Sequence, residues 1–397
     1  MALAMLLSLM AGCGSTATTT AATTAATTTS AGTTAATTTA AGFKGTYTIG
    51  VMGPLTGTNA EYGKGFQVAT KMAADEINAK GGVNGYEIKL VVKDSKGDPK
   101  ESTDLARQFA DDKNIMAIVG DFTSSSCMAA APIVDEAGIA MVSPTASNPT
   151  YAGMSKYAFS VMGRQDIEAP FFSSYVIKKF LGKTKVALIW INSDWGKSAH
   201  DNFTAQAAKD GIEVVADVNY VADEKDFTSL VSKMRSADPE VVIILDQGAV
   251  VNIANQIAQA GWKPMITALG PGTSQQIIDL GGANVEGLVT STPFFFSETN
   301  KEATAWAAKF KAASGFEPTV HPACAYDAIN MVFKAIEMSG TTVTRDSIRD
   351  NLEKMTDFVG LTGPIKFNPD GDVNRKYLIA QIEGGKFVQK TDFDYVN

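Results

Sequence analysis

From Thr46 onward, short strand-like runs alternate with helical segments, and this alternation restricts the fold more than any other feature of the chain. The β-rich run TYTIGVMG is followed by FQVATKMAADEINAK, in which Phe66, Ala69, Ala73 and Ile77 share one helical stripe. Further apolar runs follow in EIKLVVKD, IMAIVGD and GIAMVSP. Strands separated by helices form parallel sheets with helices on both faces, so we expect an α/β fold.

The alternation restarts near Arg164, which predicts a second unit of the same kind. Its strands are expected in KVALIWIN, GIEVVADVNY, EVVIILDQG and KPMITALG, with helical periodicity between them. Two later helices are predicted over 300–314 and 325–339, and the chain is expected to end in a hairpin. Ligands of open α/β sheets bind beyond the carboxyl ends of the strands. Two doubly wound lobes that face each other therefore share one site in the cleft between them.

Composition excludes several classes of protein. The chain has 397 residues and a net charge of -8, from 34 basic and 42 acidic residues, which disfavours nucleic-acid binding. Its cysteines, Cys13, Cys127 and Cys324, are too few for a disulfide framework and lack the spacing of a zinc site. We expect no metal and no cofactor.

The first residues indicate where the protein is located. Residues 1–12 are almost wholly apolar, too short to span a bilayer, and typical of the core of a secretory signal. The order Ala11-Gly12-Cys13 resembles the lipobox of bacterial lipoproteins, which implies cleavage before Cys13 and lipid attachment to its thiol. Residues 15–42 are only Ala, Thr, Ser and Gly, which cannot repay the entropy of folding. We expect a signal peptide over 1–12 and, over 13–45, a lipidated cysteine followed by a disordered tether. The alternative for the tether is a low-complexity spacer whose reach has no special role.

Two polar loops follow strands of the first unit. Ser124, Ser125 and Ser126 come after the strand in IMAIVGD, and Thr145 and Ser147 come after the strand in GIAMVSP. The serines are expected at the start of a helix, where hydroxyls, free N–H groups and the helix dipole favour a carboxylate. We predict that the two loops form an anion site; helix capping and turn formation are the alternatives.

An amino acid also needs a partner for its ammonium group and an apolar wall for its side chain. Tyr62, Trp195 and Asp246 each follow a predicted strand, and we predict that they supply these contacts. The alternatives are ordinary packing for the aromatic residues and a helix N-cap for the aspartate.

Evidence for catalysis is weak. His200 and His321 are the only histidines, and His200 falls in a predicted helix. The run WGKS lacks the first glycine of a phosphate-binding loop, since Ile191 stands in its place. No nucleophile and base pattern accompanies the serine triplet, so we do not expect an enzyme.

Several of these motifs occur together in one known family. IGVMGPLTGTNAEYGKG, the serine loop, SPTASNP and GPIKFNPDGD resemble the leucine/isoleucine/valine-binding family of ABC-transporter solute-binding proteins, from about Tyr47 to Val388. The resemblance implies the type I periplasmic binding protein fold, with two lobes that close by a hinge. It implies lobe one over 46–164 plus 294–340, and lobe two over 165–293 plus 341–397, with the terminal hairpin on lobe two.

The resemblance also implies roles for individual residues. Ser124 or Ser125, with Thr145 and Ser147, would hold the α-carboxylate of an amino acid, and Trp195 takes the aromatic position of the second lobe. Gly272 stands where the branched-chain amino-acid binders have their ammonium-binding glutamate, and Asp246 is the candidate substitute. The family often has a disulfide near the serine loop, but no partner is evident for Cys127, which we interpret as a free thiol.

The function implied is an extracytoplasmic, lipid-anchored receptor that binds a small polar solute, an amino acid of the branched-chain type, and delivers it to the membrane-bound permease subunits of an ABC importer. The alternatives are a sensory receptor of the same fold and a binder of a small amide or carboxylate. A hydrolase that acts on amides is the third hypothesis.

Overall fold

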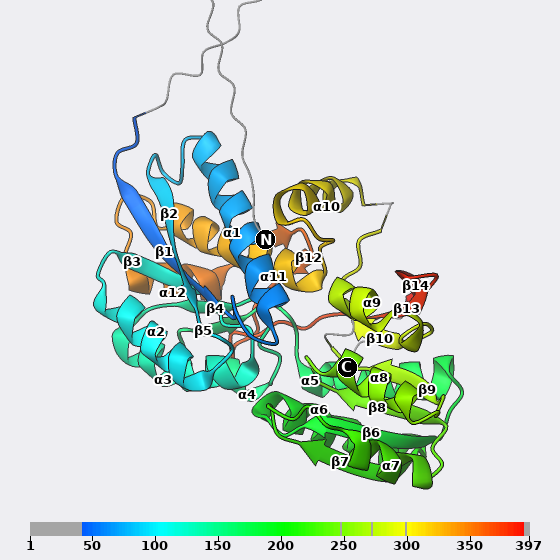
Figure 1. Ribbon diagram of the computed structural model, residues 1–397. Helices are drawn as coiled ribbons and strands as arrows, with labels where there is room; N and C mark the ends of the chain where they lie inside the picture. The colour runs from blue at the N-terminus through cyan, green and yellow to red at the C-terminus, as the bar shows by residue number, and fades with distance from the viewer. Residues whose placement is uncertain (1–41, 247, 271–272, 298–299, 393–397) are drawn as a thin grey trace, which may run out of the picture. The chain divides into compact units, whose positions relative to one another are not determined.

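The structure is a computed structural model that describes residues 42–246, 248–270, 273–297 and 300–392 (Figure 1). The signal peptide, Cys13 and most of the tether expected over 13–45, and Gly272, lie outside the described residues. The folded elements form two sheets with helices packed against them. Within the described ranges, no helix is both long enough and apolar enough to cross a membrane.

The first sheet has five parallel strands in the order β2-β1-β3-β4-β5. Its strands are β1 (Thr46–Gly53), β2 (Glu87–Asp94), β3 (Ile115–Val119), β4 (Met141–Ser143) and β5 (Ala158–Ser160). Its helices are α1 (Ala60–Ala79), α2 (Pro99–Asp111), α3 (Ser124–Ala137) and α4 (Thr150–Gly153). The predicted stripe on α1 is confirmed, because Phe66, Ala69 and Ala73 are all buried.

The second sheet has the order β14-β13-β10-β9-β8-β6-β7. Five of its strands are parallel: β6 (Lys185–Ile191), β7 (Glu213–Tyr220), β8 (Val241–Leu245), β9 (Met265–Ala268) and β10 (Val289–Thr292). The predicted terminal hairpin, β13 (Leu378–Glu383) and β14 (Lys386–Asp392), adds to β10 in the antiparallel direction. Its helices are α5 (Gln165–Phe171), α6 (Asp194–Asp210), α7 (Thr228–Ser236), α8 (Val250–Gln259) and α9 (Gln275–Gly281), with a π-helical segment (Phe172–Phe180) after α5 and a 3₁₀ turn (Gly282–Asn284) after α9. The central strand β8, VVIIL, is buried throughout, as its apolar run predicts.

After the second sheet, the chain returns to the first one. Here it forms α10 (Lys301–Ser314), α11 (Val320–Met338), α12 (Arg345–Lys354), β11 (Phe358–Gly360) and β12 (Gly363–Ile365). Both α10 and α11 pack against α1. The helix predicted over 325–339 begins earlier than expected, at Val320, because the apolar and small residues before 325 are also buried there.

The expected division of the chain needs a correction at 341–397. This whole segment is expected in lobe two, but α12 packs against α11 and β3 of lobe one. Arg345 donates to the carbonyl oxygens of Ala110, Asp112 and Ile115 at 3.0, 2.8 and 3.0 Å, and Ile348 is fully buried in the core of lobe one. An amphipathic helix requires an apolar surface, but its pattern does not specify which of two sheets provides it.

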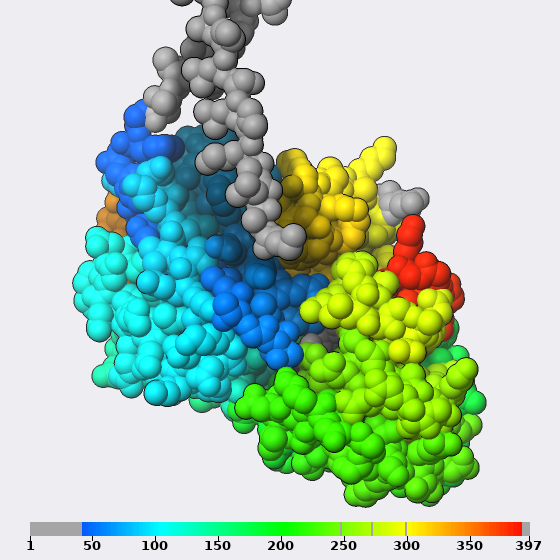
Figure 2. Space-filling view, in the orientation of Figure 1, coloured from blue at the N-terminus to red at the C-terminus, as the bar shows by residue number. Residues whose placement is uncertain are grey.

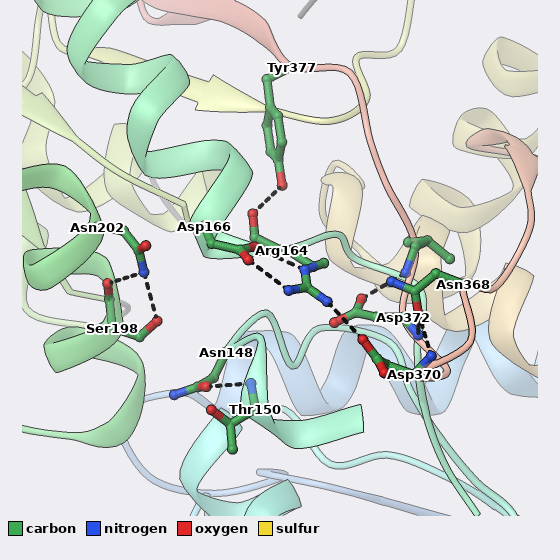
Figure 3. A network of polar contacts seen from close by, with 11 residues as sticks. Asn148, Thr150, Arg164, Asp166, Ser198, Asn202, Asn368, Asp370, Asp372 and Tyr377 are labelled. Atoms are coloured by element: carbon green, nitrogen blue, oxygen red, sulfur yellow. Dashed lines mark hydrogen bonds and ion pairs between the residues drawn. The ribbon is translucent and has the colours of Figure 1, made fainter. Parts of the chain in front are cut away.

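The chain passes between the two sheets after β5, after β10 and after β12. Arg375, in the last of these crossings, is buried and donates to the carbonyl oxygen of Val161, in the first crossing, at 2.7 Å. Figure 3 shows a second link between the same two crossings: the Arg164 guanidinium lies between Asp166, at 2.7 Å, and Asp370, at 3.7 Å. The first and last crossings are therefore bonded to each other.

Candidate ligand-binding site

A small cavity lies where loops that follow strands of both sheets converge. Its lining residues are Phe122, Thr145, Ser147, Met162, Glu168, Trp195, Gly270, Pro293, Val320 and His321. We call it the central cavity. The space left inside it is about 20 Å³, which is room for about one water molecule. Three of the predicted site residues, Thr145, Ser147 and Trp195, line it together, although 48 residues separate Ser147 from Trp195 in sequence.

A hydrogen bond joins the two lobes at the central cavity. Trp195, at the start of α6, is only 3% exposed, and its indole Nε1 donates to the Ser147 Oγ at 3.0 Å. In this contact the Ser147 oxygen accepts, so the proton of its own hydroxyl is not used. Two further bonds hold the same loops together: Asn148 Nδ2 donates to the Asp194 carbonyl at 2.9 Å, and Gln165 Nε2 donates to the Trp195 carbonyl at 3.0 Å. The start of α6 is thus fixed against the loop that follows β4.

Thr145 lines the cavity, but its donors are engaged within the protein. Its Oγ1 donates to the Phe122 carbonyl at 2.7 Å, and its N–H donates to the Ser143 Oγ at 3.2 Å. In this arrangement, Ser147 has a hydroxyl proton available for a ligand carboxylate, whereas Thr145 does not. The prediction that both residues donate to an anion stays a prediction, and Ser147 fits it better.

The serine triplet begins α3, as predicted, but its residues are not among those that line the central cavity. The residue that caps the helix is Thr123, whose Oγ1 accepts from the N–H of Ser126 at 3.1 Å. Ser124 Oγ accepts from the N–H of Asn148 at 3.2 Å, and Ser125 Oγ accepts from the N–H of Asp194, in the other lobe, at 3.3 Å. In this conformation Ser124 and Ser125 therefore join loops, the buried Ser126 Oγ has no hydrogen-bond partner among the described residues, and contact of the triplet with a ligand stays a prediction.

Tyr62 belongs to a group of packed aromatic rings and does not line the central cavity. Its ring stacks on Phe122 with centroids 4.3 Å apart and meets His321 edge-on at 4.7 Å. Phe122 and His321 face the central cavity, whereas Tyr62 faces a second cavity of about 310 Å³. These three rings separate the two cavities.

The second cavity lies between the loop after β1 and the elements that follow β8. Its lining includes Gly57, Thr58 and Tyr62 of lobe one, and Gly248, Val250 and Ser274 of lobe two. The Ser274 hydroxyl also donates to the carboxylate of Glu61 across the lobes. Figure 2 shows the blue surface after β1 in contact with the yellow-green surface of α8 and α9, which is the place of this contact.

Asp246 occupies the end of β8, as predicted, and is 2% exposed. Its Oδ2 accepts from the N–H of Ala249, which is itself the N-cap of α8, so Asp246 bonds within the turn before the helix and is not its N-cap. Asp246 is not among the residues that line either cavity. Burial, followed by the charge of Asp246, raises the pKa of Tyr220, so these two side chains are neighbours.

Glu168 is the one carboxylate among the described residues that line the central cavity, and sequence reasoning missed it. This residue lies on α5, is 4% exposed, and accepts from the Ser291 Oγ at 2.7 Å. Burial raises the pKa of Glu168 to about 7. A glutamate on a short segment, QDIEAPF, carries no pattern that marks it as buried. Its burial depends on tertiary contacts such as the bond to Ser291 of β10.

His321, one of the two histidines, lies at the wall of the central cavity. Burial lowers the pKa of His321 to about 3, so its imidazole is neutral at neutral pH. Its Nδ1 lies 3.2 Å from the Thr319 Oγ1. In the part of the chain that is described, no group of three or more His, Cys, Asp or Glu side chains is arranged to hold a metal ion. Cys127 is a buried free thiol, as predicted.

Comparison with known proteins gives a consistent result. The family model described as periplasmic binding protein matches residues 46–386. An amino acid binding protein of Pseudomonas aeruginosa is 38% identical over 196 residues, and this match spans 49% of the chain and about half, 52%, of that relative. The Leu/Ile/Val-binding protein homolog 3 of Brucella melitensis is 29% identical over 346 residues, which are 86% of this chain and 92% of the relative.

A solved structure agrees with the sequence comparisons. The branched-chain amino acid transporter substrate-binding protein of Streptococcus pneumoniae, in complex with isoleucine, has a TM-score of 0.80 and 26% identity. The alignment covers 87% of this chain and all, 100%, of that structure. The family model spans most of the chain, and the two sheets have the expected arrangement. The chain therefore belongs to the periplasmic binding protein family and has its type I fold of two α/β lobes.

Proposed function

We propose that this protein is the solute-binding component of an ABC importer and that it holds a small amino acid between its two lobes. The observation that carries the proposal is the central cavity, because lobe one contributes Ser147 and lobe two contributes Trp195, joined by a bond of 3.0 Å. A ligand that contacts both lobes stabilises the closed form over the open one. The names of the relatives and the bound isoleucine of the solved structure support a branched-chain amino acid.

The size of the central cavity fits a hinge mechanism. An amino acid does not fit into about 20 Å³, so the lobes must move apart before such a solute can enter. Opening breaks the bonds between the lobes, which include those of Trp195 to Ser147, of Ser274 to Glu61 and of Asp194 to Ser125 and Asn148. The crossings that carry Arg164 and Arg375 remain bonded and act as the hinge.

A thermal-shift screen tests the proposal directly. The purified protein is heated with each of the twenty amino acids, with small amides and with small carboxylates. A solute that binds the folded state raises the melting temperature, and a concentration of 100 times Kd stabilises by about 2.7 kcal/mol. We expect the largest rise with an aliphatic amino acid. A rise with amides or carboxylates and with no amino acid contradicts the ligand class.

Replacing Gly270 by alanine tests whether the central cavity binds the ligand. Gly270 has a φ of +80°, and an added Cβ would lie 2.9 Å from Cζ2 of Trp195. We expect a loss of stability of about 1 kcal/mol from the left-handed backbone and roughly tenfold weaker binding from the displaced indole ring. Calorimetric titration with the amino acid selected by the screen measures the second effect.

Gly211→Ala is the matched control. Gly211 has a φ of +71°, but an added Cβ would meet nothing within 4 Å. This variant keeps the backbone cost and leaves the cavity unchanged, so its affinity should equal that of the wild type. Equal affinities for Gly270→Ala and Gly211→Ala would argue against a ligand at Trp195.

We also propose that Cys13 carries a lipid that anchors the protein to the outer face of a membrane. The apolar residues 1–12, the Ala11-Gly12-Cys13 order and the Ala/Thr run that follows support this. Cys13→Ala should move the expressed protein from the membrane fraction to the soluble fraction. Cys127→Ala, at a buried thiol, is the control and should stay with the membranes. A Cys13→Ala protein that still sediments with membranes would rule out this anchor.

A further inference from the structure

Glu168 is a carboxylate without a cationic partner in a cavity that the two lobes share. It lines the central cavity beside Trp195 and Pro293, and its side chain accepts one hydrogen bond, from Ser291, at 2.7 Å. No ion pair involves Glu168 among the described residues, and Ser291 is neutral. Burying an ionised carboxylate without a partner is costly, so such a group at a binding surface is suited to a cationic ligand.

The cavity also supplies a donor. Ser147, which lines it together with Glu168, keeps a hydroxyl proton that its contact with Trp195 does not use. A solute that carries both an acceptor and an ammonium group could bond to both side chains. Phe122, Met162 and Val320 provide apolar surface in the same cavity. Neutral α-amino acids have this arrangement of groups.

We propose that Glu168 binds the ammonium group of the ligand and so selects zwitterionic amino acids over carboxylates of the same shape. This inference rests on the proposed function, since it assigns a role within the same cavity. In this inference Glu168, rather than Asp246, binds the ammonium group. Asp246 accepts a hydrogen bond from the Ala249 N–H and does not line the cavity. It also accounts for the glycine at position 272, since Glu168 reaches the site from a different element, α5.

The protonation of Glu168 gives the inference a second readout. Burial raises the pKa of Glu168 to about 7 in this conformation, so the carboxyl group is largely protonated at pH 5.5 and ionised at pH 8. The ionised form binds an ammonium, so affinity should rise with pH. If only the ionised form binds, the rise between pH 5.5 and pH 8 is about 30-fold.

The other titratable groups that face Glu168 do not change charge in this range. Tyr377 lies close enough for the charge of Glu168 to raise its pKa, after burial, which is the larger cause, and this pKa is far above neutral. His321, on α11 across the cavity, has its pKa lowered by burial to about 3. Burial also raises the pKa of Asp372, in the last crossing, to about 7, so only the part of the pH dependence near 7 that Glu168→Gln removes reports on Glu168.

The test compares three probes that differ only in their polar groups: L-leucine, 4-methylpentanoate, which lacks the ammonium, and 3-methylbutylamine, which lacks the carboxylate. Their affinities are measured by calorimetry for the wild type and for Glu168→Gln, at pH 5.5 and pH 8. We expect the wild type to prefer L-leucine to 4-methylpentanoate by at least about 30-fold at pH 8. Glu168→Gln should reduce that preference to within about threefold and remove the pH dependence.

Two further variants separate this role from a general effect on closure. Glu61→Gln removes a carboxylate that also accepts a serine hydroxyl, but outside the central cavity. Asp246→Asn removes the acid favoured by sequence reasoning. Both should leave the ratio of the L-leucine and 4-methylpentanoate affinities unchanged, even if both affinities fall together.

The outcomes distinguish this inference from the proposed function. Equal binding of L-leucine and 4-methylpentanoate by the wild type, unchanged by Glu168→Gln, overturns the role of Glu168 and leaves a solute receptor. Binding of 3-methylbutylamine that Glu168→Gln abolishes, without binding of L-leucine, supports the role of Glu168 and overturns the amino-acid function. A wild-type protein that binds none of the three overturns both.

Discussion

Trp195→Ala is expected to weaken binding of the amino acid by at least about 100-fold, which corresponds to about 2.8 kcal/mol. Trp195 is 3% exposed, lines the central cavity and donates across the lobes to Ser147. Its removal deletes one wall of the cavity and the hydrogen bond that holds the closed lobes together. Removing a buried tryptophan costs about 3–5 kcal/mol in other proteins, so the folded state should lose stability as well.

Trp195→Phe distinguishes the contribution of packing to ligand affinity from the contribution of the hydrogen bond. This variant keeps an aromatic wall and loses only the indole N–H, so we expect binding about tenfold weaker, in line with the loss of one hydrogen bond. Calorimetric titration measures both variants, and urea denaturation checks that each is folded. If Trp195→Ala binds within about threefold of the wild type, the central cavity is not the binding site.

Arg375→Met is expected to lower the free energy of unfolding by about 3–5 kcal/mol, because it removes one member of a buried charged network. Arg375 is 8% exposed and donates to the Val161 carbonyl at 2.7 Å and to the Thr362 Oγ1 at 3.1 Å. Thr362 in turn donates to the buried carboxylate of Asp327 at 2.6 Å. Without the guanidinium, the Val161 carbonyl loses its donor and Asp327 loses a nearby positive charge.

Arg375→Lys is the control for charge. A lysine keeps the positive charge, but its single nitrogen cannot take the places of the three guanidinium nitrogens through which Arg375 bonds to Val161 and Thr362. We therefore expect an intermediate loss, measured by urea denaturation in the absence of ligand. A loss below about 1 kcal/mol for Arg375→Met would mean that this network does not hold the crossings together.

The alternation of strands and helices was sufficient to predict the fold. Strands such as β8, with its apolar run, and the stripe of Phe66, Ala69 and Ala73 on α1 follow from local periodicity alone. The position of α12 did not follow, because its apolar face, with Ile348, fits a surface on either sheet. The contact that decides between them is made by Arg345, with carbonyl oxygens more than 200 residues earlier in the chain.

The candidate site was predicted in part. Residues in loops directly after strands, Thr145, Ser147 and Trp195, meet at one cavity because the carboxyl ends of parallel strands share an edge. Asp246 also follows a strand directly, but it bonds to the backbone N–H of Ala249 before α8 and does not line the cavity. Its place after a strand was therefore not sufficient to predict its role. Glu168 was missed because it belongs to a helix in a crossing, and only tertiary packing directs it into the cavity.

The bonds between the first and last crossings restrict how the lobes can move. Arg375 joins the last crossing to Val161, and Arg164 joins the first crossing to Asp370. Two chain crossings that are bonded to each other can bend together. Twisting one crossing against the other is resisted, because it would break the bonds between them. We therefore expect the lobes to open and close along one path, which brings Trp195 back to hydrogen-bonding distance of Ser147 each time the protein closes.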